Sequence, residues 1–281
     1  MPPLNTDLMA MTAKILFTAK TIRLPIKWKK PNYQFPQAFN PSQLMVPLNP
    51  PTPPFEFFSP TANKYHVSAA ASIGKKFAAY IDGICSAIGK GVDFFRSTAY
   101  LQGMQIYASL AIGTPGCLNA PPIGPTILAA APKATKYEEA YSKAIANAIG
   151  TRWFEWQSGL IVPGLPWYPP FVSFPGPITP PTPNTPQPLI ICPSTKFASL
   201  SKPALKSTMI RQLNHKHAPH HKDLFDAICK AFILVFMIWL TQQNITNAMG
   251  FGPVPTFAPP VLPAGPVVGG TVLPNPGIFV S

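Results

Sequence analysis

Charged side chains are scarce in this chain, and two long stretches have none at all. Asp, Glu, Lys and Arg make up 11% of the 281 residues, well below the usual quarter. None of the four occurs in residues 157–195 or 231–281. Hydrophobic residues nevertheless reach 47%, whereas disordered chains combine low hydrophobicity with high charge. The composition therefore excludes an ordinary disordered protein and predicts extensive burial.

Acidic residues and catalytic motifs are also few. The 9 acidic residues leave few carboxylate pairs, and the four cysteines form no C-x-x-C pair. We therefore expect buried or free thiols rather than a cysteine metal site. The sequence contains no G-x-S-x-G, P-loop, H-E-x-x-H or dinucleotide-binding fingerprint. We expect no enzyme, no catalytic residues and no cofactor, and an enzyme with an unrecognised site is the least favoured alternative.

One cluster of residues, four histidines, has side chains that can bind a metal ion. It comprises His215, His217, His220 and His221. Imidazoles so close in sequence can bind zinc or copper. However, a lysine and a proline lie among them, and no cysteine or carboxylate precedes them at a matching spacing. We interpret the cluster as a basic loop and expect no metal.

The composition of residues 1–63 predicts a basic arm followed by a proline-rich zone. The first residues of this region do not form a convincing signal peptide. Residues 22–28 alternate between apolar and basic side chains, which is the period of a strand. The net charge of the chain is +13, which favours an acidic partner. The basic contacts expected in the arm are Lys20, Arg23, Lys27, Lys29 and Lys30. We expect them to dock on an acidic neighbour, with nucleic-acid phosphates as the alternative.

Proline, at 39 residues, is far above average usage and gathers in three apolar zones. Proline fixes φ and cannot donate a backbone hydrogen bond, so such segments adopt extended conformations. The segment 164–188, GLPWYPPFVSFPGPITPPTPNTPQP, is uncharged and aromatic. We interpret it as a strap that lies in grooves of other subunits, with an SH3 or WW ligand as the alternative. The expected interface residues are Trp153, Trp156, Trp167, Tyr168, Phe171 and Phe174.

Four helices are predicted between the proline zones, at about 66–111, 135–150, 203–213 and 223–242. Thr135 and Glu138 match a capping box, and Gly150 is a plausible C-cap. Gly89 and Gly91 allow close approach of a neighbour or split the first helix. The expected fold class is mainly α, with short helices, extensive irregular coil, long extended straps and little strand.

The apolar run Ala227–Leu240 raises the question of a membrane span. It has 14 residues, includes Lys230 and is followed by polar residues, whereas a span needs about 20 apolar residues. We therefore expect a buried helix. A basic membrane-associated protein anchored by this helix remains the alternative function.

The chain divides by composition into five regions. These are an arm with the first proline-rich zone at 1–63, a helical region at 64–156, the proline- and aromatic-rich strap at 157–198, a second helical region at 199–249, and an uncharged tail at 250–281.

Residues 150–281 resemble structural proteins of tailed phages and of phage-like contractile injection systems. The segments that carry the resemblance are RWFEWQSGLIVPGLPWYPPFVSFPGPITPPTPN and GPVPTFAPPVLPAGPVVGG. The resemblance implies a non-enzymatic tail or baseplate component of a virion, made in the host cytoplasm. It also implies a homo-oligomer that binds other structural proteins of one assembly through extended arms, with nucleic acid and membrane as less favoured partners.

Overall fold

The apolar run at 227–240 lies in helix α7 (His221–Gln242), which forms the centre of a helical half of the molecule. Buried side chains recur along one side of α7 from Leu224 to Leu240, and the helix packs against α1 (Thr6–Thr18) and α6 (Lys202–Gln212). Among the described residues, α7 alone is long and apolar enough to cross a membrane, yet 67% of its most apolar window is buried inside the protein. The prediction of a buried helix is confirmed.

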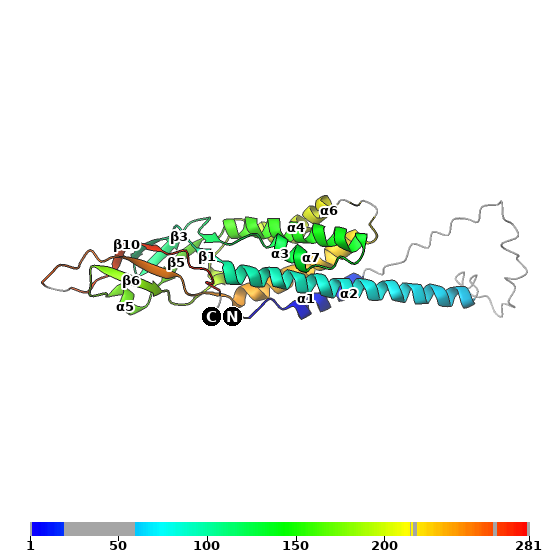
Figure 1. Ribbon diagram of the computed structural model, residues 1–281, viewed down its shortest axis with the longest axis horizontal. Coiled ribbons are helices and arrows are strands. Elements are labelled where there is room, and N and C mark those ends of the chain that lie inside the picture. Colours follow the sequence, from blue (N-terminus) through cyan, green and yellow to red (C-terminus); the bar gives the residue numbers. More distant parts are fainter. Residues whose placement is uncertain (1, 20–59, 214, 216–217, 261–262, 280–281) are drawn as a thin grey trace, which may run out of the picture.

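This computed structural model describes residues 2–19, 60–213, 215, 218–260 and 263–279. The molecule is elongated, with the helical half at one end and a β-sheet at the other (Figure 1). Helix α2 (Pro60–Thr98) runs along the helical half and projects beyond it, away from the sheet (Figure 1). The predicted strand at 22–28 lies outside the described residues. Helix α1, which precedes it, was not predicted.

Small residues set how closely the helices approach one another. A Cβ at Gly91 of α2 would lie 2.4 Å from Ile127 of α3 (Gly124–Ala130), and one at Gly89 would lie 2.3 Å from Thr6. The glycines therefore permit close packing and do not split α2. Gly150 is no C-cap, because α4 (Lys136–Ser158) continues past it. A Cβ at Gly150 would lie 2.8 Å from the Cα of Gly124, so α3 and α4 meet there backbone to backbone.

The predicted N-cap at Thr135 is confirmed, whereas the Glu138 carboxylate bonds the residue before the cap instead of the cap amide itself. The Thr135 hydroxyl accepts a hydrogen bond from the Glu138 amide at 3.2 Å, and the Glu138 carboxylate accepts one from the Ala134 amide at 2.9 Å. Two amide donors at the helix start are thereby satisfied.

Antiparallel strands form the other half of the molecule. The six-stranded sheet has the order β5-β3-β2-β10-β9-β6. Its strands are β5 (Val162–Pro166), β3 (Leu110–Gly113), β2 (Gln105–Ala108), β10 (Val267–Val272), β9 (Met249–Pro253) and β6 (Ile178–Pro183). Two small sheets pair β1 (Tyr100–Leu101) with β4 (Leu118–Asn119) and β7 (Gln187–Pro188) with β8 (Asn244–Ile245).

The prediction of a mainly α fold with little strand is therefore wrong, because the protein is mixed α/β. The first predicted helix ends at Thr98, and β1, β2 and β3 occupy the stretch that follows. The C-terminal tail supplies β9 and β10, two inner strands of the large sheet. The strands β2, β3, β9 and β10 have only four to six residues, and glycine or proline lies within β9 and β10. The alternation of buried and exposed residues is therefore too short to be recognised in the sequence.

The predicted strap at 164–188 is also corrected. It folds back on its own chain as β5, α5 (Pro169–Val172), β6 and β7. Two short 3-10 helices, η4 (Leu189–Ile191) and η5 (Phe197–Leu200), lead on to α6. The extended geometry that proline imposes is used within a sheet rather than between subunits.

Aromatic side chains link the two halves. The cluster comprises Phe95, Trp153, Trp156, Phe236, Trp239 and Phe279. The rings of Phe95 and Trp153 meet edge to face at 5.0 Å, and Phe279, which follows the last strand, stacks on Phe95 at 5.6 Å. Burial of such rings favours a single cooperative fold.

The four cysteines are free and buried, as predicted. Burial raises the pKa of Cys85, Cys192 and Cys229 to about 12. Burial also raises the pKa of Cys117. These thiols therefore behave as small core side chains.

Candidate functional site

The outer face of the six-stranded sheet carries a row of exposed apolar side chains. Tyr107 of β2 lies directly opposite Leu110 of β3 on one side and Val268 of β10 on the other. Directly opposed residues of antiparallel strands share one face. Leu110, Tyr107 and Val268 are 46%, 53% and 44% exposed, so the row faces solvent.

A second row runs beside the first. Ile112 pairs with Gln105, Gln105 with Thr271, and Thr271 with Phe251. A bulge between Val268 and Gly270 contains Gly269 at φ +73. Because the bulge adds one residue, Val268 and Thr271 point to the same face despite their odd spacing. We define the outer sheet face as Leu110, Tyr107, Val268, Ile112, Gln105, Thr271 and Phe251, together with Ile178 and Pro253, which pair at the β6 edge.

The inner face of the sheet is covered by the chain itself. Trp167 is buried and stacks on Phe171 of α5 at 5.4 Å. Its indole N–H donates to the Thr182 carbonyl at 3.0 Å, and a Cβ at Gly250 of β9 would lie 2.7 Å from its ring. Phe174 is half-buried, and Tyr168 is exposed. Trp167 and Phe171 were expected at a subunit interface, but they fill the space under the sheet and are not available to a neighbour.

Both edges of the sheet carry proline. The edge strand β5 contains Pro163 and Pro166, and the other edge strand, β6, contains Pro180, Pro181 and Pro183. Proline has no N–H to offer a further strand, and natural proteins use it to block edge-to-edge pairing. The two edge strands also meet at one end, because Trp167 bridges Asn184 and the Thr185 amide donates to the Pro166 carbonyl at 2.8 Å. The edges of the sheet are therefore protected, and its outer face is exposed to solvent.

No described strand contains a charged residue. The strands lie within residues 97–132, 157–195 and 231–281, and none of these stretches contains Asp, Glu, Lys or Arg. The charged side chains of the described residues belong to the helical half and the segments that join its helices. The molecule thus has one charged and one uncharged end.

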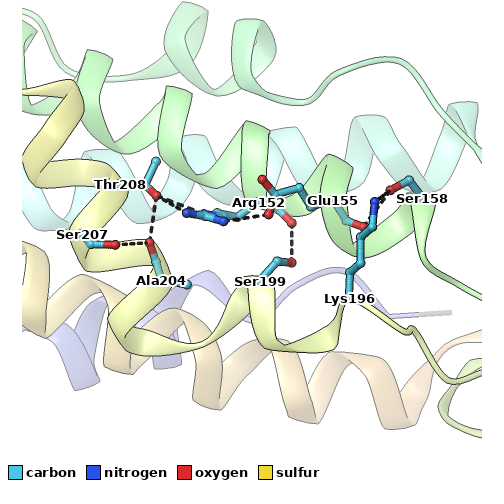
Figure 2. Close-up of polar contacts among 8 residues, drawn as sticks. All are labelled: Arg152, Glu155, Ser158, Lys196, Ser199, Ala204, Ser207 and Thr208. Carbon is cyan, nitrogen blue, oxygen red and sulfur yellow. Dashed lines mark hydrogen bonds and ion pairs between the residues drawn. The ribbon is translucent and has the colours of Figure 1, made fainter.

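The densest polar cluster in the helical half connects α4 to α6 and η5 (Figure 2). The Arg152 guanidinium donates to Thr208 from Nε at 3.0 Å and from Nη2 at 2.8 Å, and to Glu155 from Nη1 at 2.8 Å. The Ser199 hydroxyl donates to the Arg152 carbonyl at 3.0 Å. The Arg152–Glu155 pair lies within α4, but the contacts with Thr208 and Ser199 reach α6 and η5, so we interpret the cluster as a link between helices. Trp153 and Trp156, also expected at an interface, lie beside it in the core and are 1% exposed.

A second charged cluster surrounds Asp226 of α7. Its carboxylate lies 2.8 Å from the Lys206 ammonium, 3.1 Å from that of Lys202 and 3.5 Å from that of Lys230. Burial raises the pKa of Asp226, but hydrogen bonds and charge from Lys206 and Lys202 outweigh it and hold that pKa well below its usual range. Three cations around one carboxylate leave an excess of two positive charges.

The described histidines do not converge. The ring of His215 packs on Tyr137, that of His220 on Phe77, and that of His221 on Phe225. The described residues hold no group of three His, Cys, Asp or Glu side chains placed to bind a metal ion. The predicted basic contacts at Lys20, Arg23, Lys27, Lys29 and Lys30 lie outside the described residues.

No family model, curated protein or solved structure matches the chain. The outer sheet face therefore has to be interpreted from its own chemistry. Sequence reasoning missed Tyr107, Leu110 and Val268, because they lie in segments assigned to a helix or to coil. The signal that points to them is the absence of charge from 97–132, which extends the uncharged stretches at 157–195 and 231–281.

Proposed function

We propose that the protein is a non-enzymatic structural subunit of a larger assembly, and that it docks through the outer sheet face. The observation that supports this proposal is a solvent-exposed, uncharged apolar face whose edges are blocked by proline. Given the resemblance of residues 150–281 to phage and injection-machine proteins, the proposed assembly is a virion tail or baseplate, with other structural proteins as further neighbours.

Burial of the outer sheet face by a partner is energetically favourable. Fully burying one large apolar side chain stabilises a protein by about 1.5–3 kcal/mol. Leu110, Tyr107, Val268, Ile112 and Ile178 are each about half exposed, so covering all five would contribute several kcal/mol. The largest apolar patch on a protein surface is often a binding site.

The proposed partner is the outer sheet face of a second copy. A charged surface would lose its hydration there without gaining a counter-charge, which is unfavourable. A second copy offers an uncharged face of the same shape, and a two-fold axis makes such a contact self-complementary. Tyr107 and Val268 lie on β2 and β10, the two central strands, where an axis would pass.

The size of the outer sheet face indicates that two copies paired through it need additional contacts to stay associated. The strands have four to six residues. Six strands about 4.8 Å apart, at about 3.4 Å per residue, give about 400–600 Å² per copy. Two copies would bury about 800–1,200 Å², at the lower limit for specific interfaces. A weak pair of this kind suits a subunit that is held by additional neighbours.

The test compares the full chain with a triple variant, Tyr107→Lys, Leu110→Lys and Val268→Lys, by analytical ultracentrifugation. We expect the natural chain to self-associate and the variant to be monomeric with an unchanged circular dichroism spectrum. The matched control is Tyr137→Lys with Phe154→Lys, two exposed aromatics of α4, and it should associate like the natural chain. A monomeric natural chain, or equal association of the triple variant, would contradict the proposal.

A further inference from the structure

Helix α7 presents an exposed stripe on the side opposite the core. The stripe comprises Lys230, Leu234, Met237 and Ile238, which recur at spacings of three and four along the helix. Residues at these spacings share one face of an α-helix. Leu234, Met237 and Ile238 are exposed, although the rest of α7 is mostly buried. A helix that only fills a core does not need apolar residues on its outer side. The exposed apolar stripe therefore indicates a surface that binds a partner.

Neighbouring elements extend the apolar surface. Helix α1 packs along α7, and its exposed Met11 and Ile15 lie one turn apart, opposite the buried Met9, Ala13 and Phe17. At the C-terminal end of α7, the amide of Leu189 donates to the Gln243 carbonyl at 2.8 Å. This contact holds η4 against the end of α7, and Ile190 and Ile191 of η4 are exposed. We define the helical face by eight exposed or half-exposed side chains: Met11 and Ile15 of α1, Lys230, Leu234, Met237 and Ile238 of α7, and Ile190 and Ile191 of η4. Asp7, one turn before Met11, is an exposed acid at the margin of this face.

The lysines around Asp226 adjoin this face. Lys230 belongs to the α7 stripe itself, one turn before Leu234. Lys202 and Lys206 reach the same carboxylate from α6. The Asp226 side chain is 4% exposed, whereas the three lysine side chains are 30–40% exposed. The charge of Asp226 is therefore covered, and the three lysine ammonium groups meet solvent, with the half-buried Asp223 one turn earlier on α7.

We propose that the helical face binds the surface of an anionic membrane, with α1 and α7 lying along the interface. Apolar side chains on one side of a helix enter the boundary between headgroups and acyl chains, and lysines beside them contact anionic headgroups. Long lysine side chains suit this position, because the stem covers apolar surface while the ammonium stays in water. The partner is thus defined by its chemistry as a lipid surface that carries phosphate charge.

The side-chain types favour lipid over a protein partner. Protein interfaces are enriched in Tyr, Trp, Phe, Met and Arg and depleted in Lys. The helical face has methionines but no aromatic or arginine side chain, and three lysines lie beside it, whereas the outer sheet face has a tyrosine at its centre. A position across the bilayer is disfavoured, because the opposite side of α7 packs in the core and Asp226 with its lysines lies near the helix start. The helical face and the outer sheet face are independent surfaces.

The test is flotation of the full chain with vesicles of phosphatidylcholine, with or without phosphatidylglycerol, at low salt. We expect strong binding only to vesicles that contain phosphatidylglycerol. The variant Lys202→Gln with Lys230→Gln keeps Lys206 beside Asp226, and its partition coefficient should fall about thirtyfold. The matched control, Lys75→Gln with Lys76→Gln, removes the same charge from an exposed part of α2 and should bind like the natural chain.

A second variant tests the apolar half of the face. Leu234→Gln with Ile238→Gln should lose the binding that persists when salt is raised, since apolar insertion is not screened. Failure of the natural chain to float with anionic vesicles, or equal floating of the Lys202→Gln, Lys230→Gln variant, would overturn the proposal. Resistance of bound protein to alkaline extraction would also overturn it, because that result indicates a spanning helix. None of these outcomes bears on self-association through the sheet.

Discussion

The buried carboxylate of Asp226 forms ion pairs with three lysines. Because its pKa is depressed in the folded protein, its contribution to stability is present above the ordinary aspartate pKa of 3.8 and is lost as the pH falls below it. The group therefore stabilises the contact between α6 and α7 at neutral pH, and acid removes this contribution.

We predict that Asp226→Asn lowers the free energy of unfolding by about 1–3 kcal/mol at neutral pH, since hydrogen bonds to a charged group are lost. Urea unfolding at a series of pH values measures the effect. The difference from the natural chain should shrink as the pH falls below 3.8. Asp82→Asn, which removes a half-exposed partner of Lys14, is the control and should change stability by less than about 1 kcal/mol. A difference that does not vary with pH would contradict the assigned role of the charge.

At the scale of single elements, the prolines of the edge strands have a distinct role. Pro180 and Pro181 are exposed in β6, at an irregularity of its pairing with β9 between Thr179 and Thr182. Without them the strand would offer amide donors to another chain.

We therefore predict that Pro180→Thr with Pro181→Thr promotes ordered aggregation through the β6 edge, because two strand-compatible residues restore the missing donors. Thioflavin fluorescence during incubation of the full chain measures the effect. Pro121→Thr with Pro122→Thr, two exposed prolines outside the strands, is the matched control. If both variants stay soluble to the same extent, edge protection is not the function of these prolines.

The elements also differ in how far the sequence could predict them. Helix α4 was recognisable from a cap at Thr135 and from apolar side chains one turn apart, because local contacts determine both. The strands could not be recognised from the sequence, since β2 and β3 have four residues each and the sheet includes strands from distant parts of the chain. The same limit applies to the outer sheet face. Val268 joins Tyr107 only through pairing of β10 with β2, and no local pattern encodes that register.

At the scale of the whole molecule, the C-terminal segment joins the sheet half to the helical half. After β10, the amides of Gly277 and Ile278 donate to the Ala99 carbonyl at 2.9 and 3.3 Å. Phe279 then enters the aromatic cluster and is fully buried against Phe95.

We predict that Phe279→Ala lowers the free energy of unfolding by about 3–5 kcal/mol, because it removes a buried ring and leaves a cavity. Chemical unfolding should be followed by circular dichroism and by tryptophan fluorescence. We expect both signals to change in one coincident transition, at lower denaturant than in the natural chain. Phe197→Ala, at an exposed phenylalanine of η5, is the control and should have little effect. Two separate transitions in the natural chain would show that the halves fold independently.

The division of the molecule into a charged and an uncharged end means that dissolved salt acts on the two ends in opposite ways. Exposed charges are screened over about 10 Å at 0.1 M salt, so contacts made by the lysines beside α7 weaken as salt is added. Contacts made by the outer sheet face contain no charges to screen, and salts such as sulfate strengthen the burial of apolar surface. Under the two proposals, raising the ionic strength would release the lysine-bearing end from a membrane while the uncharged end stays bound to its partner.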